Sequence, residues 1–290
     1  MRGTVRSGIA LAIGLLVAWS AAAETVGFET EDGFSLTAEL WRAKDPGAPV
    51  AILLHQLNQD RHSFGALQPA LSAAGFTVLS LDQRGQGAST HRRTPEGEKT
   101  IRIRSLSRER AKELVRDGAK DVAAALAELS RLGLATSSVV LVGSSYGCTV
   151  ALLAAEKDPR VRAVALLSPG ADYFGVDVLG AARSFRGTLF AVAAEDDPVD
   201  SSPPGTRAIG AAHEGPEEIR ILPRGGHGTA LLEAEPKLAA EIAALLAAAV
   251  HPPRGASTRT QPQRVQGPLP EETLRPPGPF GRAGVATPSG

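Results

Sequence analysis

The residues Gly143-Ser144-Ser145-Tyr146-Gly147 place Ser145 between two glycines that stand two positions to either side of it. An apolar run beginning at Val139 precedes them, and an Ala/Leu-rich stretch follows them. This pattern predicts a sharp turn between a strand and a helix, from which the Ser145 hydroxyl projects. Such a serine could act as a nucleophile in acyl transfer. A plain strand-to-helix turn with a capping serine is the alternative interpretation.

A serine hydroxyl needs a base, and a group that orients the base, before it attacks at neutral pH. Of the six histidines, His227 is the best placed, because it lies in a glycine-rich stretch between an expected strand and the last expected helix. The orienting carboxylate is expected in the acidic stretch 195–200, which follows another expected strand and also contains Glu195 and Asp200. Asp197, directly before Pro198, is the first candidate, and Asp196 remains the alternative.

Short apolar runs that alternate with helix-like stretches predict the elements that would position these residues. The expected strands are 25–30, 34–42, 50–55, 76–81, 139–142, 161–167, 189–193 and 219–222, and the expected helices are 64–74, 108–132, 145–156 and 230–250. The pattern predicts an α/β fold with a mostly parallel central sheet, helices on both faces and an N-terminal β-hairpin. Ligands bind beyond the carboxyl ends of the strands in such sheets.

The order Ser145, Asp197, His227, each after a strand, resembles the α/β-hydrolase fold superfamily over residues 25–250, in its compact serine esterase and dienelactone-hydrolase-like branch. His55-Gln56-Leu57 is similar to the family's oxyanion loop, although Gln56 replaces its usual glycine, and residues 82–89 are similar to its Asp-x-Arg-Gly-x-Gly-x-Ser turn. The resemblance implies an acyl-enzyme on Ser145, with His227 as base and Asp197 as its orienting group. It also implies an oxyanion hole made by the backbone N–H groups of Tyr146 and Leu57. Cys148 stands where many relatives carry a second glycine and is interpreted as a packing residue.

About 20 residues separate Leu167 from Leu189, too few for a large cap domain between the two strands. We therefore expect an open site that hydrolyses small-molecule carboxylic esters or thioesters, with no cofactor and no metal. Ser145-Tyr146-Gly147 also resembles prolyl-oligopeptidase-type serine peptidases, and a non-catalytic binding protein on the same fold is a third hypothesis. The basic segment 90–110, which includes Arg102 and Arg104, is either a clamp for anionic substrates or a solvated surface.

Both ends of the 290-residue chain have compositions unlike that of a folded domain. Residues 1–23 combine Arg2 and Arg6 with a short apolar run and a small-residue cleavage site, which predicts a signal peptide and a secreted or periplasmic protein without stable membrane insertion. An uncleaved N-terminal anchor is the alternative. Residues 252–290 predict a disordered Pro/Gly/Arg-rich tail, either passive or partner-binding, and leave a hydrolase domain at 24–251. The formal net charge of zero gives no reason to expect a nucleic-acid partner, and a single cysteine excludes an internal disulfide.

Overall fold

A ten-stranded sheet organises residues 23–251, which are the part of the chain that the computed structural model describes. The strand order is β10-β9-β8-β7-β3-β4-β2-β5-β6, and β1 pairs with β2. The strands are β1 (Glu24–Glu29), β2 (Phe34–Trp41), β3 (Val50–Leu54), β4 (Thr77–Leu81), β5 (His91–Thr94), β6 (Gly97–Thr100), β7 (Val139–Ser144), β8 (Val161–Leu167), β9 (Thr188–Ala194) and β10 (Glu217–Leu222). The six strands from β10 to β4 in this order pair in parallel, so the predicted mostly parallel sheet is confirmed.

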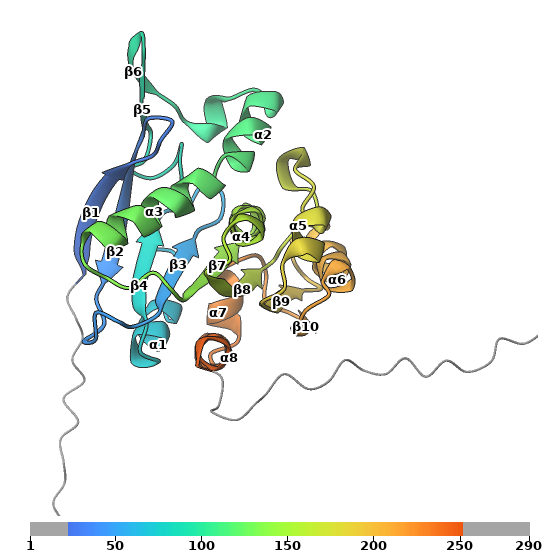
Figure 1. Cartoon of the computed structure of the whole chain (residues 1–290). Helices are drawn as coiled ribbons and strands as arrows, with labels where there is room; N and C mark the ends of the chain where they lie inside the picture. Colours follow the sequence, from blue (N-terminus) through green and yellow to red (C-terminus); the bar gives the residue numbers. More distant parts are fainter. Residues whose placement is uncertain (1–22, 252–290) are drawn as a thin grey trace, which may run out of the picture. The chain divides into compact units, whose positions relative to one another are not determined.

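Helices cover both faces of this sheet, as predicted (Figure 1). On one face lie α1 (Leu67–Ala73), α7 (Ala230–Ala234) and α8 (Leu238–Val250), and on the other lie α2 (Arg108–Arg116), α3 (Ala119–Arg131), α4 (Tyr146–Lys157), α5 (Leu179–Ser184) and α6 (Ser202–Ala212). Each layer packs its own apolar cluster against the sheet. Because β3, β4 and β7 are buried along their whole length, they appear in the sequence as continuous apolar runs.

The predicted N-terminal β-hairpin is confirmed: β1 and β2 pair antiparallel along their whole length. The side chains of β2 alternate between buried and half-buried positions, which is the pattern of a strand with one face against the core. β2 also pairs antiparallel with β4. The hairpin therefore extends the parallel sheet on the side remote from β10.

Two of the predicted helices are each divided in the structure. Residues 108–132, expected as one helix, form α2 and α3 with Asp117 and Gly118 between them. Gly118 packs against α4 so closely that a Cβ there would lie 2.8 Å from Val150 Cγ2. The expected helix 230–250 is divided between α7 and α8, where Pro236 disfavours helical conformation in the residue before it.

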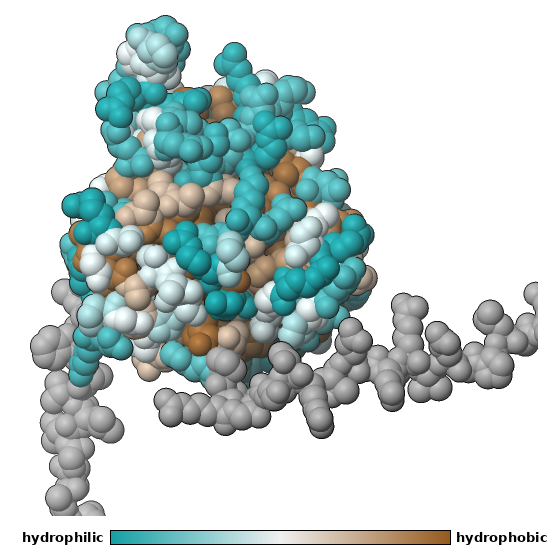
Figure 2. Space-filling view, viewed as in Figure 1, coloured by the Kyte–Doolittle hydropathy of each residue, from teal (hydrophilic) through white to brown (hydrophobic). Residues whose placement is uncertain are grey.

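The sequence analysis missed a β-hairpin and two helices, α5 and α6. The basic segment after β4 forms the hairpin β5–β6 and then the 3-10 turn η1 (Ile103–Ser105). Its strands are entirely polar, so they lack the apolar alternation that predicts a strand, and hydrophilic side chains cover its tip (Figure 2). Helix α6 begins with Ser-Pro-Pro-Gly, a loop-like sequence that the first turn of a helix tolerates.

The connection between β8 and β9 is short, as predicted. Within the described residues it contains only the 3-10 turn η2 (Tyr173–Gly175) and α5, so no large cap domain stands there. No helix among residues 23–251 is long and apolar enough to cross a membrane. The predicted tail at 252–290 and the predicted signal peptide, apart from residue 23, lie outside the described residues.

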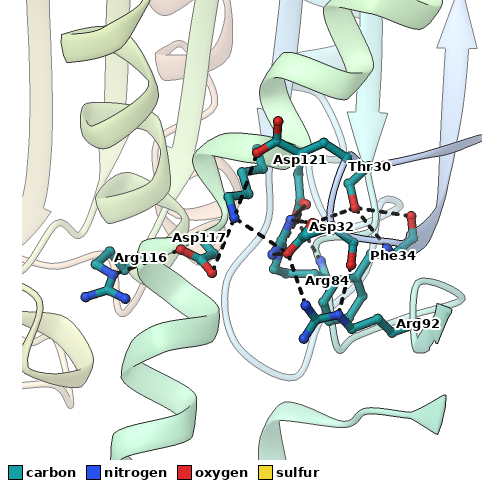
Figure 3. Close-up of polar contacts among 10 residues, drawn as sticks. Thr30, Asp32, Phe34, Arg84, Arg92, Arg116, Asp117 and Asp121 are labelled. Atoms are coloured by element: carbon teal, nitrogen blue, oxygen red, sulfur yellow. Dashed lines mark hydrogen bonds and ion pairs between the residues drawn. The ribbon is translucent and has the colours of Figure 1, made fainter. Parts of the chain in front are cut away.

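A buried ion-pair network connects the turn after β4 to helix α3 and to the turn between β1 and β2 (Figure 3). The Arg84 guanidinium is 3% exposed, and its Nε donates a hydrogen bond to Asp121 Oδ1 at 2.7 Å. Arg84 Nη1 also donates to Asp32 Oδ2, in the turn between β1 and β2, at 2.9 Å. Burial raises the pKa of Asp121 to about 6, against the opposing effect of Arg84. The network thus holds the turn after β4 against both α3 and the N-terminal hairpin.

Candidate active site

Ser145 occupies a strained turn between β7 and α4, as the glycine spacing predicts. Its backbone has φ 54° and ψ −124°, and its N–H donates to the Leu167 carbonyl at 2.8 Å. A Cβ on Gly147 would lie 2.2 Å from the Leu54 carbonyl oxygen, and one on Gly143 would lie 2.6 Å from Cys148 Cα. Any side chain at these two positions would push the turn away from β3 or from α4. The glycines therefore allow the close packing that lets Ser145 adopt a conformation found mainly at functional sites.

The structure brings the side chains of Ser145, His227 and Asp197 into one chain of hydrogen bonds. Ser145 Oγ lies 2.7 Å from His227 Nε2. His227 Nδ1 lies 2.8 Å and 2.9 Å from the two carboxylate oxygens of Asp197. This geometry fits an imidazole that carries its proton on Nδ1, donates it toward the carboxylate and accepts from the serine hydroxyl. Ser145 and Asp197 are buried, and His227 is partly exposed.

Asp196, the alternative carboxylate, points to a different partner. Its Oδ1 accepts hydrogen bonds from the backbone N–H groups of Gly225 and Gly226, at 2.8 Å and 2.9 Å. These glycines directly precede His227 in the loop after β10. Asp196 therefore holds the loop that carries the histidine, while its neighbour Asp197 contacts the imidazole.

Gln56 joins the loop after β3 to the histidine loop. Its side-chain Oε1 accepts from Ser144 Oγ at 2.6 Å and from the Thr229 N–H at 2.9 Å. Gly228, at φ +63°, lies so close that a Cβ there would be 2.1 Å from Gln56 Oε1. The sequence analysis missed this role, and its only signal was that Gln56 stands where the family usually has glycine. The hydroxyl of Ser144, adjacent to the predicted nucleophile, is thus turned toward Gln56 and not toward His227.

The two predicted oxyanion donors lie at the start of α4 and in the loop after β3. Tyr146 is the first residue of α4, where a backbone N–H has no acceptor within the helix. Leu57 lies in the loop after β3, and in the described part of the chain its N–H donates to no protein acceptor. Their role in the reaction remains a prediction.

His55 shapes the loop that carries Leu57. Its Nδ1 lies 2.8 Å from the Gln56 carbonyl oxygen, and its Nε2 lies 3.2 Å from the Gln83 backbone N. Burial lowers the pKa of His55, which favours the neutral imidazole. A neutral ring with its proton on Nδ1 satisfies both contacts, so His55 orients the loop from within the core.

Three further sequence hypotheses concern residues near this site. Cys148 is fully buried beneath the turn, and burial raises the pKa of its thiol well above the usual value, as expected for a packing residue and not for a nucleophile. Arg102 and Arg104 are both exposed, and Arg104 donates to the Asn58 side chain beside Leu57. The anion clamp remains a prediction. No group of three or more His, Cys, Asp or Glu side chains in residues 23–251 is placed to hold a metal ion.

Comparison with known proteins identifies the fold family. A family model described as alpha/beta hydrolase fold matches residues 49–197. An esterase from Pyrococcus furiosus is similar, with a TM-score of 0.59 and 16% identity over 78% of this chain and 90% of that chain. An acylaminoacyl peptidase from Pyrococcus horikoshii gives a TM-score of 0.59 and 14% identity over 80% of this chain and 41% of that chain. Epoxide hydrolase A of Mycobacterium tuberculosis is 48% identical over 48 residues, which are 17% of this chain and 15% of that protein.

These matches differ in what they establish. The two structural likenesses have low sequence identity and show a shared fold, and the matched segment spans only 15% of the epoxide hydrolase. The family match covers just over half of the 290 residues and includes β3, β4, β7, the turn at Ser145 and Asp197. The chain belongs to the α/β-hydrolase fold family.

Proposed function

We propose that this protein is an exported serine hydrolase that cleaves carboxylic esters or thioesters through an acyl-enzyme on Ser145. The observation that carries the proposal is the continuous hydrogen-bond chain from Ser145 Oγ through the His227 imidazole to the Asp197 carboxylate. That chain supplies a nucleophile, a base and a group that orients the base, which acyl transfer by a serine requires.

In the proposed mechanism, Ser145 Oγ attacks the ester carbonyl carbon while its proton passes to His227 Nε2. The carbonyl oxygen becomes an oxyanion, which the N–H groups of Tyr146 and Leu57 stabilise. Collapse of the tetrahedral intermediate breaks the bond to the leaving alcohol or thiol, and His227 returns the proton to it. Water, activated by His227, then attacks the acyl-enzyme and releases the acid and free Ser145. Asp197 keeps the imidazole in the required tautomer and stabilises the imidazolium.

A serine peptidase is the second candidate, and the likeness to the acylaminoacyl peptidase of Pyrococcus horikoshii favours it. This chain spans only 41% of that protein, however, so the likeness is to one part of a larger chain. The third hypothesis is a non-catalytic binding protein. It gives no reason for Ser145, His227 and Asp197 to be in hydrogen-bond contact. Both are outcomes of the experiment below.

A fluorophosphonate probe followed by mass spectrometry of the labelled peptide tests the proposal. We expect one adduct on Ser145 that disappears in Ser145→Ala and His227→Ala and persists in His251→Ala, a control histidine at the exposed end of α8. Hydrolysis of p-nitrophenyl acyl esters without hydrolysis of peptide anilides would support the esterase. The reverse preference would establish the peptidase, and an unlabelled, inactive wild type would leave the binding protein.

Export is a separate part of this proposal and rests on residues 1–23, which match the pattern of a cleavable signal peptide. The mature chain is expected to begin at Glu24 and to occur outside the cytoplasm. Mass spectrometry of the N-terminal peptide from cytoplasmic and exported fractions measures both. An exported chain that retains residues 1–23 would establish the uncleaved anchor instead.

A further inference from the structure

The turn that follows β4 holds a glutamine near the proposed oxyanion hole. The turn is rigid: the Gln86 N–H donates to the Gln83 carbonyl at 3.0 Å, and the Ser89 N–H donates to the Gln86 carbonyl at 2.9 Å. Asp82, fully buried, accepts from the Ala88 N–H at 2.8 Å. Gln86 is itself 7% exposed. The Asp-x-Arg-Gly-x-Gly-x-Ser pattern therefore builds an anchored support for the Gln86 side chain.

The two ends of the Gln86 amide contact the loop after β3 and the start of α4. These two segments carry the predicted oxyanion donors. Its Oε1 accepts a hydrogen bond from the Asn58 backbone N–H at 2.8 Å, and Asn58 directly follows Leu57. Its Nε2 donates to the hydroxyl of Tyr146, which directly follows Ser145. One side chain thus links the loop after β3 to the start of α4.

The contact to Asn58 restrains a backbone in the left-handed region. Asn58 has φ 67°, a conformation that residues other than glycine seldom adopt, although asparagine does so more readily than most. The N–H that Gln86 accepts belongs to the peptide group between Leu57 and Asn58, so the bond fixes the plane of that peptide. Without it, Asn58 could relax toward negative φ, and Leu57 would rotate with it.

The contact to Tyr146 acts on the other donor. The Tyr146 ring is buried and packs edge-on against Phe174, with the ring centroids 5.8 Å apart. The hydroxyl end of the ring is held by Gln86. The side chain of the first residue of α4 is therefore held both at its ring and at its hydroxyl.

We propose that Gln86 is a positioning residue that holds the Leu57 and Tyr146 N–H groups in the geometry that stabilises the oxyanion. This inference rests on the proposed function. It assigns Gln86 no contact with substrate, and its effect passes through the two backbone donors. Loss of the link should therefore weaken binding of the tetrahedral state far more than binding of the ester itself.

The variant Gln86→Met keeps the length of the side chain and removes both hydrogen bonds. We expect kcat to fall about 10- to 100-fold, less than or equal to the loss of a complete oxyanion donor. KM should stay within about twofold, because ground-state binding does not use the oxyanion. The Ki of a trifluoromethyl ketone, which adds to the serine as a tetrahedral oxyanion, should rise by the same factor as kcat falls.

Tyr146→Phe removes only the hydroxyl partner of Gln86. It should show a smaller fall in kcat and a smaller rise in Ki, with KM unchanged. This variant tests the proposal in the case that Gln86→Met folds poorly. The double variant should lose less than the product of the two single losses. Gln68→Met, on α1, is the control for the substitution itself. Melting temperatures of all variants separate a stability loss from a change at the site.

A trifluoromethyl ketone Ki within twofold of wild type in both Gln86→Met and Tyr146→Phe would overturn the proposal and leave the proposed function intact. A wild type that neither labels on Ser145 nor hydrolyses esters would instead refute the proposed function. The first failure is seen in the Ki of the variants and the second in the activity of the wild type, so the two can be told apart.

Discussion

Gln56 Oε1 lies 2.6 Å from Ser144 Oγ and, through the same oxygen, accepts the Thr229 N–H. One amide therefore connects the loop after β3, the serine beside the proposed nucleophile and the loop that carries His227. A second hydrogen bond holds the histidine loop: Ser168 Oγ accepts from the Gly228 N–H at 2.9 Å. The position of the imidazole thus depends on side chains that never touch it.

Replacement of Gln56 by glycine, the residue usual in the family, should slow the reaction here. The change removes an acceptor shared by Ser144 and Thr229, and each lost hydrogen bond is worth about 1 kcal/mol. We expect kcat for a p-nitrophenyl ester to fall about fivefold or more, since about 1 kcal/mol in an activation free energy is a factor of about five. Gln68→Gly, on the surface of α1, is the control for loss of a glutamine. Full activity in Gln56→Gly would show that the histidine loop does not need this link.

Asp197 and Asp196 should respond differently to the same change. Asp197→Asn leaves the size of the side chain unchanged but favours the wrong imidazole tautomer, and we expect kcat to fall by about 10⁴. Asp196→Asn keeps an oxygen that can accept from the Gly225 and Gly226 N–H groups, so a loss below about tenfold is expected. Initial rates with one ester measure both. Equal losses in the two variants would contradict the assignment of Asp197 to the imidazole.

Gly147→Ala should damage folding as well as activity. The new Cβ would stand 2.2 Å from the Leu54 carbonyl oxygen, and its nearest neighbours are backbone atoms of Leu54 and His55, which cannot move aside as a flexible side chain can. We expect the free energy of unfolding to fall by about 1–3 kcal/mol, the usual cost of overpacking, with loss of ester hydrolysis. Gly180→Ala is the matched control, because nothing lies within 4 Å of a Cβ there and alanine favours the helix α5. Urea unfolding compares the two, and an equal response of both variants would refute the steric argument.

Arg84→Met should leave the fully buried Asp121 carboxylate without its ion-pair partner and cost about 3–5 kcal/mol of unfolding free energy at pH 7. The cause is that Asp121 loses the cation that opposes the effect of its burial. In the double variant Arg84→Met/Asp121→Leu no such buried carboxylate remains, so it should be more stable than Arg84→Met alone. Glu96→Gln, which breaks the exposed pair with Lys99, should change the stability far less, because water screens that pair.

The raised pKa of Asp121 predicts that the stability of the protein depends on pH. The pKa of Asp121 is raised to about 6 in the folded protein, above its ordinary value of 3.8, so the folded state binds more protons than the unfolded state between these values. Its contribution to stability therefore grows as the pH falls through this window and is smallest above about pH 6. The unfolding free energy of the wild type should therefore rise relative to that of Asp121→Asn as the pH falls from 6 to 4. A fall of the wild type relative to Asp121→Asn on acidification would contradict the raised pKa.

Much of the fold could be predicted from the sequence because local patterns determine it. The continuous apolar runs of β3, β4 and β7 indicate strands buried on both faces, and the glycine spacing around Ser145 indicates the sharp turn. The polar hairpin β5–β6 and the break between α2 and α3 were missed. The hairpin carries no apolar alternation, and the break depends on how closely Gly118 approaches α4, which no local pattern reveals.

The sequence by itself determined which residue types stand at the ends of which strands, and hence that a serine, a carboxylate and an imidazole could meet at one edge of the sheet. Only the tertiary structure decided which of two adjacent aspartates faces the imidazole, and that Gln56 and Gln86 link the surrounding loops. The physical reason is the separation along the chain of the residues that interact. Strands and turns follow from interactions between near neighbours in the chain, whereas these hydrogen bonds join residues up to 173 positions apart and exist only once the sheet has formed.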